Sequence, residues 1–389
     1  MPLLPALRRR PRQAVPPQAP AGATPDGRVP AGRLLPRGVV VLLGVALAFG
    51  VLLGLHELRS YVAPVFLALN LVIAAAPLQA LLRRSGVPTW LAAAVAALSV
   101  FAFLIAFFGA LGWSVARLVE ELPRYQEQFE ALYQQVLDLL AGFGIEEATL
   151  TDQLRSALNP EAIVGALGGV VGNVGGVVAL LATTLIVTVF LMVDTLSAGR
   201  RLDLVREQHP RLADALAAFA HGVQRYWLVT TIFGLIVAAL DVVALSLLGV
   251  PLALTWGVLA FVTNYIPNVG FVIGLFPPAV MALLANGPTN ALIVVVVYTV
   301  INFVVQSLIQ PKFTGDAVGV TPTVTFVSLV LWAWVLGPIG ALLALPATLV
   351  VKALLVDADP QARWLNAFFA SDPDTARAET TRDAVLQQP

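Results

Sequence analysis

An isolated acid within an apolar segment is the residue of this chain with the clearest potential for chemistry. Asp241 lies in the run Ala239-Leu240-Asp241-Val242, deep inside a hydrophobic stretch over Tyr226–Leu248. A charge at the centre of a bilayer costs about 2.5–3.5 kcal/mol on insertion scales, so Asp241 needs a polar partner or a water-filled cavity. Two interpretations stay open: a ligand for a proton or cation, and a neutral, hydrogen-bonded acid in helix packing.

Carboxamides gather around the same part of the chain. Amides both donate and accept hydrogen bonds, which suits a neutral, polyol-like or borate-diester solute better than a strongly charged one. Three of them are spaced by four residues and therefore share one helix face. Hydrogen bonds between helices, worth about 0.6 kcal/mol on average, are an equally good explanation. The candidates are Asn264, Asn268, Asn302, Gln306 and Gln310.

Prolines interrupt the apolar segments near these amides. A proline within a helix leaves a backbone carbonyl without its hydrogen bond, and unwound carbonyls of this kind hold solutes or ions in transporters. The fold also needs the breaks, so the two roles coexist. The candidate binding residues of this kind are Pro267, Pro311 and Pro338, with Gly270 and Gly340 beside two of them.

The composition identifies a membrane protein. The chain is 58% hydrophobic and 12% charged, with a mean hydropathy of +0.85, against about 45–50% and about 25% in soluble domains. A soluble protein of 389 residues has too little interior for that much apolar surface. We therefore expect an all-α, polytopic integral membrane protein.

The sequence lacks the residues that several classes of protein need for their chemistry. Without cysteine there is no thiolate nucleophile or Cys-zinc site, and the three histidines lack metal-ligand spacing. The only lysines, Lys312 and Lys352, do not follow glycine, which excludes a Walker P-loop. Nucleic-acid binding has only the N-terminal arginines in its favour, and membrane topology explains them better. We expect no enzyme and no cofactor.

The apolar segments divide into six full spans and four arms that are too short to cross. A spanning helix needs roughly 20 apolar residues, and broken backbone at membrane depth must be buried in protein or line a watery cavity. We therefore predict two re-entrant hairpins. The spans are about Gly38–Leu55, Tyr61–Leu82, Pro88–Gly112, Gly168–Val193, Tyr226–Leu248 and Ala291–Ile309, and the hairpins are Leu252–Ile266 with Val269–Ala285 and Thr323–Leu336 with Ile339–Val356.

These segments predict six regions. The first, residues 1–37, is rich in arginine and proline and is expected to be a disordered basic cytoplasmic tail. The others are the first three spans over 38–112, extracytoplasmic amphipathic helices over 113–163, the fourth span and a cytoplasmic loop with basic residues at Arg200–Arg211 over 164–222, the transport core over 223–356, and a cytoplasmic tail over 357–389.

The basic residues set the predicted orientation. With both termini inside, the clusters at Arg83-Arg84, Arg200–Arg211, Lys312 and Arg363 all fall on the cytoplasmic side, as the positive-inside rule requires. Trp113–Ile163, with three arginines against nine acids, then lies outside. The basic clusters and the acidic composition of Trp113–Ile163 therefore indicate the same orientation.

An amphipathic helix is expected over residues 115–140. Apolar residues recur at spacings of three and four from Val115 to Leu139, interrupted only by Pro123. This stripe must be buried against something. The two partners considered are the chain's own Thr149–Leu158 helix and a second copy of the chain, which would make a homo-oligomer.

The two hairpins are related by a 70-residue offset. Gly249-Val250 aligns with Gly319-Val320, Thr255 with Thr325, and Gly270 with Gly340. In the predicted topology each span-plus-hairpin unit enters from the opposite side. That arrangement is an inverted repeat of the kind that serves alternating access.

Proline- and glycine-containing motifs surround the predicted breaks. They are Leu247-Leu248-Gly249-Val250-Pro251, Tyr265-Ile266-Pro267-Asn268-Val269-Gly270, Gln310-Pro311-Lys312, Val320-Thr321-Pro322 and Gly337-Pro338-Ile339-Gly340-Ala341. As a set they resemble the AI-2E transporter family, over about Pro36–Trp364. Asn268 departs from the aromatic residue common at its place, and Val305 and Gln306 stand where many members carry a glutamate.

The resemblance implies a transporter of the bacterial inner membrane. The family takes its name from export of autoinducer-2 and includes permeases and sodium/proton antiporters. The leading hypothesis is a secondary exporter of small polar solutes, autoinducer-2-like in class, with H⁺ or Na⁺ as a possible second ligand and the lipid bilayer as surroundings. One alternative is a sodium/proton antiporter that uses Asp241. Another is a non-transporting oligomeric scaffold, which predicts a dry, fully packed interface between the hairpins.

Overall fold

The computed structural model describes residues 36–142, 165, 174–267, 269–310, 320–359, 362 and 365–369. Every regular element in these residues is a helix. The chain divides into two compact units, Met1–Val51 and Leu52–Pro389. The described part of the first unit is the start of α1 (Arg37–Glu57), and all the contacts discussed below lie within the second unit.

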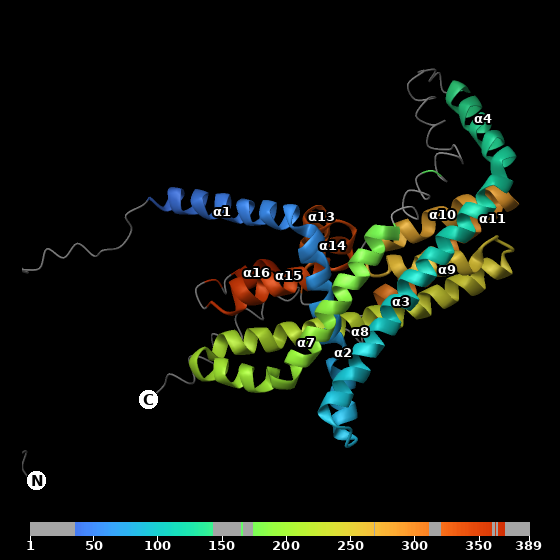
Figure 1. Cartoon of the computed structure of the whole chain (residues 1–389). Helices are drawn as coiled ribbons and strands as arrows, with labels where there is room; N and C mark the ends of the chain where they lie inside the picture. The colour runs from blue at the N-terminus through green and yellow to red at the C-terminus, as the bar shows by residue number, and fades with distance from the viewer. Residues whose placement is uncertain are drawn as a thin grey trace, which may run out of the picture. The chain divides into compact units, whose positions relative to one another are not determined.

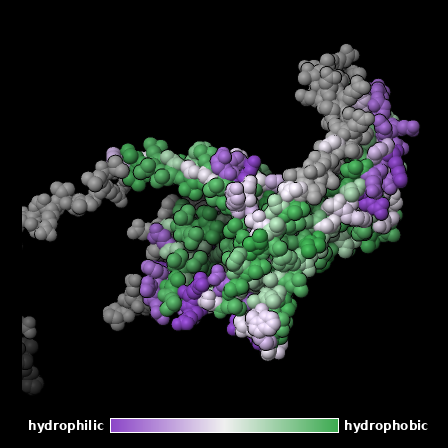
Figure 2. Space-filling view, in the orientation of Figure 1, coloured by the Kyte–Doolittle hydropathy of each residue, from purple (hydrophilic) through white to green (hydrophobic). Residues whose placement is uncertain are grey.

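Six helical segments are long and apolar enough to cross a membrane. The first of these segments lies in α1. The other five lie mainly in α2 (Arg59–Arg84), α3 (Thr89–Glu121), α7 (Val174–Gln208), α8 (Pro210–Leu247) and α11 (Pro288–Asn302) (Figure 1). Large side chains on these helices are exposed, for example Phe190 at 69% and Leu247 at 83%, and Figure 2 shows the hydrophobic surface that they form. The prediction of six spans in an all-α membrane protein is confirmed.

Two helix boundaries differ from the prediction. α3 continues past Gly112 to Glu121, and α7 runs through Arg200 and Arg206 to Gln208. The connection predicted at Arg200–Arg211 is therefore helical except at His209, and its cytoplasmic location stays a prediction. Charge ends a hydrophobic segment, but arginine, leucine and glutamate are good helix formers. The chain turns only where Pro210 takes the first position of α8.

The predicted amphipathic helix packs against another helix of the same chain. Pro123 produces a short 3₁₀ turn, η1 (Leu122–Tyr125), before α4 (Gln126–Gly142). Leu122 and Phe129 are buried with Leu284 of α10, a partner that the sequence had not indicated. The other face of α4 is hydrophilic (Figure 2). Thr149–Leu158 lies outside the described residues, and the homo-oligomer stays a prediction.

The short arms form two packed helical hairpins. The first pairs α9 (Ala253–Thr263) with α10 (Gly270–Asn286). The second pairs α13 (Pro322–Leu336) with α14 (Pro338–Leu342) and α15 (Ala344–Lys352), followed by the π-helix η4 (Ala353–Asp357). Its second arm, predicted to be continuous, is interrupted at Leu343. The break predicted after Ile266 falls between the end of α9 at Thr263 and the start of α10 at Gly270, and the break predicted after Leu336 falls between α13 and α14. The short α16 (Asn366–Phe369) follows.

Equivalent glycines allow close packing in both hairpins. A Cβ atom on Gly270 would overlap the carbonyl group of Thr263, and one on Gly340 would overlap that of Trp332. The 70-residue offset aligns the two glycines, and the two carbonyls differ by a single residue from the same offset. The two hairpins therefore share one packing device, which supports the repeat seen in the sequence.

An aromatic core joins the first hairpin to the spans. Tyr265 lies with its ring centroid 5.8 Å from that of Phe107 on α3, 5.4 Å from Trp227 on α8 and 5.6 Å from Phe261 on α9. The contacts with Phe107 and Phe261 are edge-to-face, and such pairs stabilise a packed core beyond simple area burial. Tyr265, 1% exposed, thus fixes the break after α9 against two long helices.

Candidate functional site

Asp241 is buried in the last quarter of α8. Its side chain is 0% exposed, and neither carboxylate oxygen has a hydrogen-bond partner among the described residues. Tyr298 of α11 also lines this position, is 1% exposed, and its hydroxyl likewise lacks a partner. Buried polar groups are nearly always hydrogen-bonded, so two unsatisfied groups in one place mark an unusual site.

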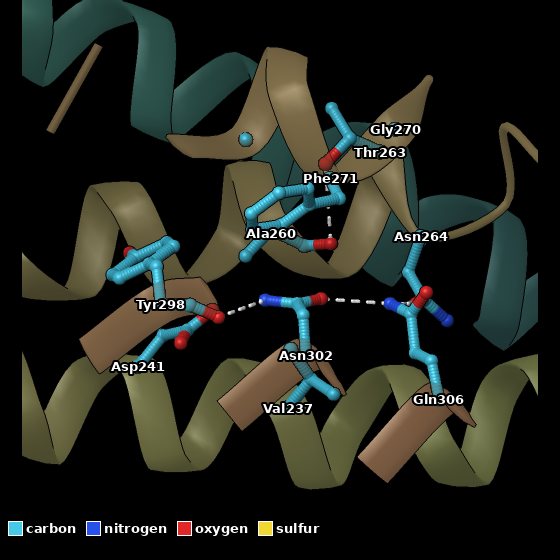
Figure 3. Close-up of a pocket in the computed structure, with 11 residues that line it drawn as sticks. Val237, Asp241, Ala260, Thr263, Asn264, Gly270, Phe271, Tyr298, Asn302 and Gln306 are labelled. Carbon is cyan, nitrogen blue, oxygen red and sulfur yellow. Dashed lines mark hydrogen bonds between the residues drawn. The ribbon is translucent and has the colours of Figure 1, made fainter. Parts of the chain in front are cut away.

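A small pocket contains both groups (Figure 3). Its volume is about 10 Å³, which is at the lower limit for one water molecule. Helices α8, α9, α10 and α11 and the π-helix η2 (Phe303–Ile309) all contribute to it. Its polar lining consists of Asp241, Thr263, Asn264, Tyr298, Asn302 and Gln306.

Three of the five predicted carboxamides, Asn264, Asn302 and Gln306, form a continuous series of hydrogen bonds. Asn302 Nδ2 donates to the Tyr298 carbonyl at 2.9 Å. Gln306 Nε2 donates to Asn302 Oδ1 at 2.7 Å and to Asn264 Oδ1 at 3.1 Å. Asn264 Nδ2 in turn donates to the carbonyl of Thr230 at 3.0 Å. This series of hydrogen bonds links α11, η2, the first hairpin and α8.

Gln306 lies in a π-helix, which is an unusual helix type. α11 ends at Asn302, and η2 continues it as a π-helix. Single π-helical turns within α-helices are rare and occur frequently at functional sites. The predicted shared face is confirmed for Asn302 and Gln306, which are bonded to each other, whereas Gln310 follows η2 and lines a second, larger cavity.

The larger cavity has a volume of about 420 Å³, within the range of small-molecule sites. Asn264, Phe271 and Gln306 line both cavities. None of the described lining residues is an Asp, Glu, Lys or Arg. Its hydroxyl and amide lining is Tyr226, Thr230, Asn264, Tyr265, Gln306, Gln310 and Thr325, and its apolar lining is Val229, Ile266, Pro267, Phe271, Val320 and Leu345.

Tyr226 connects the two hairpins at the edge of this cavity. Its buried hydroxyl donates a shared hydrogen bond to the Tyr265 carbonyl at 3.0 Å and the Leu342 carbonyl at 3.1 Å. Thr231 Oγ1 lies 2.8 Å from Tyr265 Oη on the same side. Sequence reasoning missed this residue, because a tyrosine at the start of an apolar segment is typical of an interfacial anchor.

The remaining predicted site residues have different positions. Gly270 lines the small pocket, and Pro267 and Gln310 line the larger cavity. Pro338 is exposed at the start of α14 and Gly340 is buried in hairpin packing, and neither lines these two cavities. Asn268 and Pro311 lie outside the described residues.

Six apolar spans and a buried polar site within the second unit, together with the family match given next, define a polytopic helical membrane protein of the transporter class. The chain belongs to the AI-2E family: the family model described as "AI-2E family transporter" matches residues 39–358. The resemblance seen in the proline and glycine motifs is thereby confirmed.

Relatives of this chain carry transport in their names. The AI-2 transport protein TqsA of Escherichia coli K12 is 28% identical over 82% of this chain and 91% of its own length. The putative transport protein YhhT of the same organism is 26% identical over 81% and 90%. A putative transport protein of Haemophilus influenzae is 28% identical over 83% and 94%.

Proposed function

We propose that this protein is a secondary transporter that exports a small, uncharged polar solute through the larger cavity. The observation that carries the proposal is the composition of that cavity, whose described lining combines amides and hydroxyls with apolar walls and includes no ionised side chain. A charged solute leaving water would need compensating charges here, whereas a neutral one needs only hydrogen-bond partners.

The lining favours a solute rich in hydroxyl groups. Gln306, Gln310 and Asn264 each offer both a donor and an acceptor, and Thr325 adds a hydroxyl. Phe271 and Leu345 can cover a carbon skeleton. Neutral polyols have this mixture of surfaces. The name of the relative TqsA, an AI-2 transport protein, supports an autoinducer-2-like solute for this chain as well.

Alternating access is the proposed mechanism. The two hairpins would enter the bacterial inner membrane from opposite faces as an inverted repeat, with both termini cytoplasmic. The arginine distribution supports this orientation, and the shared glycine packing supports the repeat. Tyr226 would then act as the joint, since one hydroxyl bonded to a carbonyl of each hairpin can favour either carbonyl.

Two other functions are weighed against this one. Sodium/proton antiport is favoured by the buried, unpartnered carboxyl of Asp241, and a sodium gradient in the assay below tests it. A non-transporting scaffold predicts a dry interface between the hairpins. The cavity of about 420 Å³, lined by Ile266 of the first hairpin and Leu345 of the second, argues against that scaffold.

The test is solute flux in vesicles that contain the purified full-length chain. Autoinducer-2 and a panel of neutral polyols are offered, with amino acids and organic acids as charged comparisons. We expect saturable flux of a neutral member, which Gln306→Leu reduces strongly because it removes two amide hydrogen bonds and part of the cavity lining.

The matched control is Gln79→Leu. Gln79 is also buried and hydrogen-bonded, to Thr195, but it lies outside both cavities, so this variant should retain the flux. Absence of saturable flux for every solute, or flux of charged solutes alone, would defeat the proposal.

A further inference from the structure

We propose that Asp241 and Tyr298 form a proton-binding site that couples proton movement to solute transport. The inference rests on the proposed function and assigns a second ligand to it. The site is the small pocket of about 10 Å³ between α8, α9, α10 and α11. Three arguments from the described residues support it: missing partners, the type of ligand, and a link to the solute cavity.

The first argument is that two titratable groups line the same pocket without hydrogen-bond partners. Asp241 Oδ1 and Oδ2 and Tyr298 Oη are all buried and unsatisfied within the described residues. Leaving a buried polar group unsatisfied costs about 1–3 kcal/mol. A helix pair that only needed packing would be more stable with apolar side chains at these positions, so a ligand explains them better.

The described lining of the pocket contains no positively charged side chain that could compensate the carboxyl. The described pocket lining from α9 and α10 is Ala260, Thr263, Asn264, Gly270, Phe271 and Gly274, and none of these titrates. Tyr298 from α11 is the one other titratable group of that lining. A carboxylate buried without a partner is strongly unfavourable, so the pocket suits a carboxyl that carries a proton and releases it only when water enters.

The second argument concerns the type of ligand. A metal cation needs several oxygen ligands, and the amide oxygens of Asn264 and Asn302 are already held by hydrogen bonds from Gln306. The Asp241 carboxyl and the Tyr298 hydroxyl remain without partners, in a pocket with room for about one water molecule. These residues therefore hold a proton better than a sodium ion.

The third argument is the link to the solute cavity. Gln306 lines both cavities and shares its Nε2 group between Asn302 and Asn264. Asn302 is bonded to the carbonyl of Tyr298, next to Asp241 in the pocket (Figure 3). A solute that accepts a hydrogen bond from Gln306 withdraws it from Asn302 and so changes the surroundings of the carboxyl.

The proton step is a simple transfer. On one side of the membrane a hydronium ion protonates one carboxylate oxygen of Asp241, which forms an O–H bond and leaves water. On the other side this bond breaks and the proton returns to a water molecule. No electrons are transferred and no other bond changes.

The first experiment measures proton movement and solute flux together. Vesicles that contain the full-length chain and an internal pH-sensitive dye are given the solute identified in the flux assay, with and without sodium. We expect proton movement in wild type that follows the solute. Asp241→Asn should lose it, down to the level of protein-free vesicles, while solute exchange without a gradient continues.

Two further variants sharpen this measurement. Tyr298→Phe should weaken proton coupling and leave exchange intact, because it removes the second unsatisfied group. Asp194→Asn changes an exposed acid of α7 that pairs with Arg201 and should behave as wild type. Flux in wild type without proton movement, coupling that survives in Asp241→Asn, or coupling to sodium instead overturns the inference and leaves the proposed function standing.

A second experiment does not depend on flux. Infrared spectra of the purified chain in H₂O and D₂O should contain the carbonyl stretch of a buried, protonated carboxylic acid, and Asp241→Asn should lack it. If no solute is transported, the proposed function fails, and this band alone then decides the proton site. A band that persists in Asp241→Asn overturns that site.

Discussion

The two hairpins share a packing device but differ in their chemistry. Gly270 and Gly340 each let the second arm of a hairpin approach a carbonyl of the first arm. The first hairpin supplies residues to both cavities, including Asn264 and Phe271. The second contributes Thr325 and Leu345 to the edge of the larger cavity. Of the two hairpins, the first therefore supplies more of the site, and the following variants test that difference.

Adding a methyl group to either close-packing glycine should have the largest effect. Gly270→Ala and Gly340→Ala both force a Cβ atom into a carbonyl group, and overpacking of this kind costs about 1–3 kcal/mol or more. We expect a similar fall in thermal unfolding temperature for both variants in detergent. Gly109→Ala is the control, since its Cβ atom would meet open space. A large loss for one hairpin alone would show that the device is not shared.

Tyr226→Phe should separate the two hairpins. It leaves the carbonyls of Tyr265 and Leu342 without their shared donor, at a cost of about 1–3 kcal/mol for a buried group left unsatisfied. We expect a lower unfolding temperature and faster hydrogen exchange at both hairpin tips. Tyr61→Phe, at a side chain that is 71% exposed, should change neither. Exchange that rises at one tip only would contradict the role of Tyr226 as a joint.

A substitution in the first hairpin should weaken solute binding more than a substitution in the second. Asn264→Leu removes the acceptor of Gln306 and the donor to Thr230, and about 1–3 kcal/mol lost there corresponds to roughly 5- to 150-fold weaker solute binding. Thr325→Val should cost less, because its hydroxyl also bonds within α13, to the Thr321 carbonyl at 3.0 Å. Concentration dependence of solute flux measures both. Equal losses would mean that the hairpins share the site.

Trp332→Phe should give the smallest effect. The Trp332 indole Nε1 donates to Thr348 Oγ1 at 3.2 Å within the second hairpin, and a hydrogen bond of this kind contributes about 0.5–1.5 kcal/mol. We expect a small decrease in unfolding temperature and an unchanged solute dependence of flux. A change in the solute dependence would place the second hairpin closer to the site than its contacts indicate.

Local chemistry made much of the fold predictable. Hydropathy identified the six spans, since apolar length is a property of consecutive residues. Proline and glycine marked the breaks near Pro267 and Gly337 because they limit or free the backbone where they stand. The isolation of Asp241 and the four-residue spacing of Asn302 and Gln306 indicated the polar site for the same reason.

Long-range packing decided the rest. Only the folded chain shows that Tyr226 bonds two carbonyls that lie 39 and 116 residues away, that η2 places Gln306 between two cavities, and that α4 packs on α10. Pro338 and Gly340 have the same residue types as the site positions but lie outside both cavities. Residue type sets what a side chain can do, whereas its neighbours depend on helices that meet from distant parts of the chain.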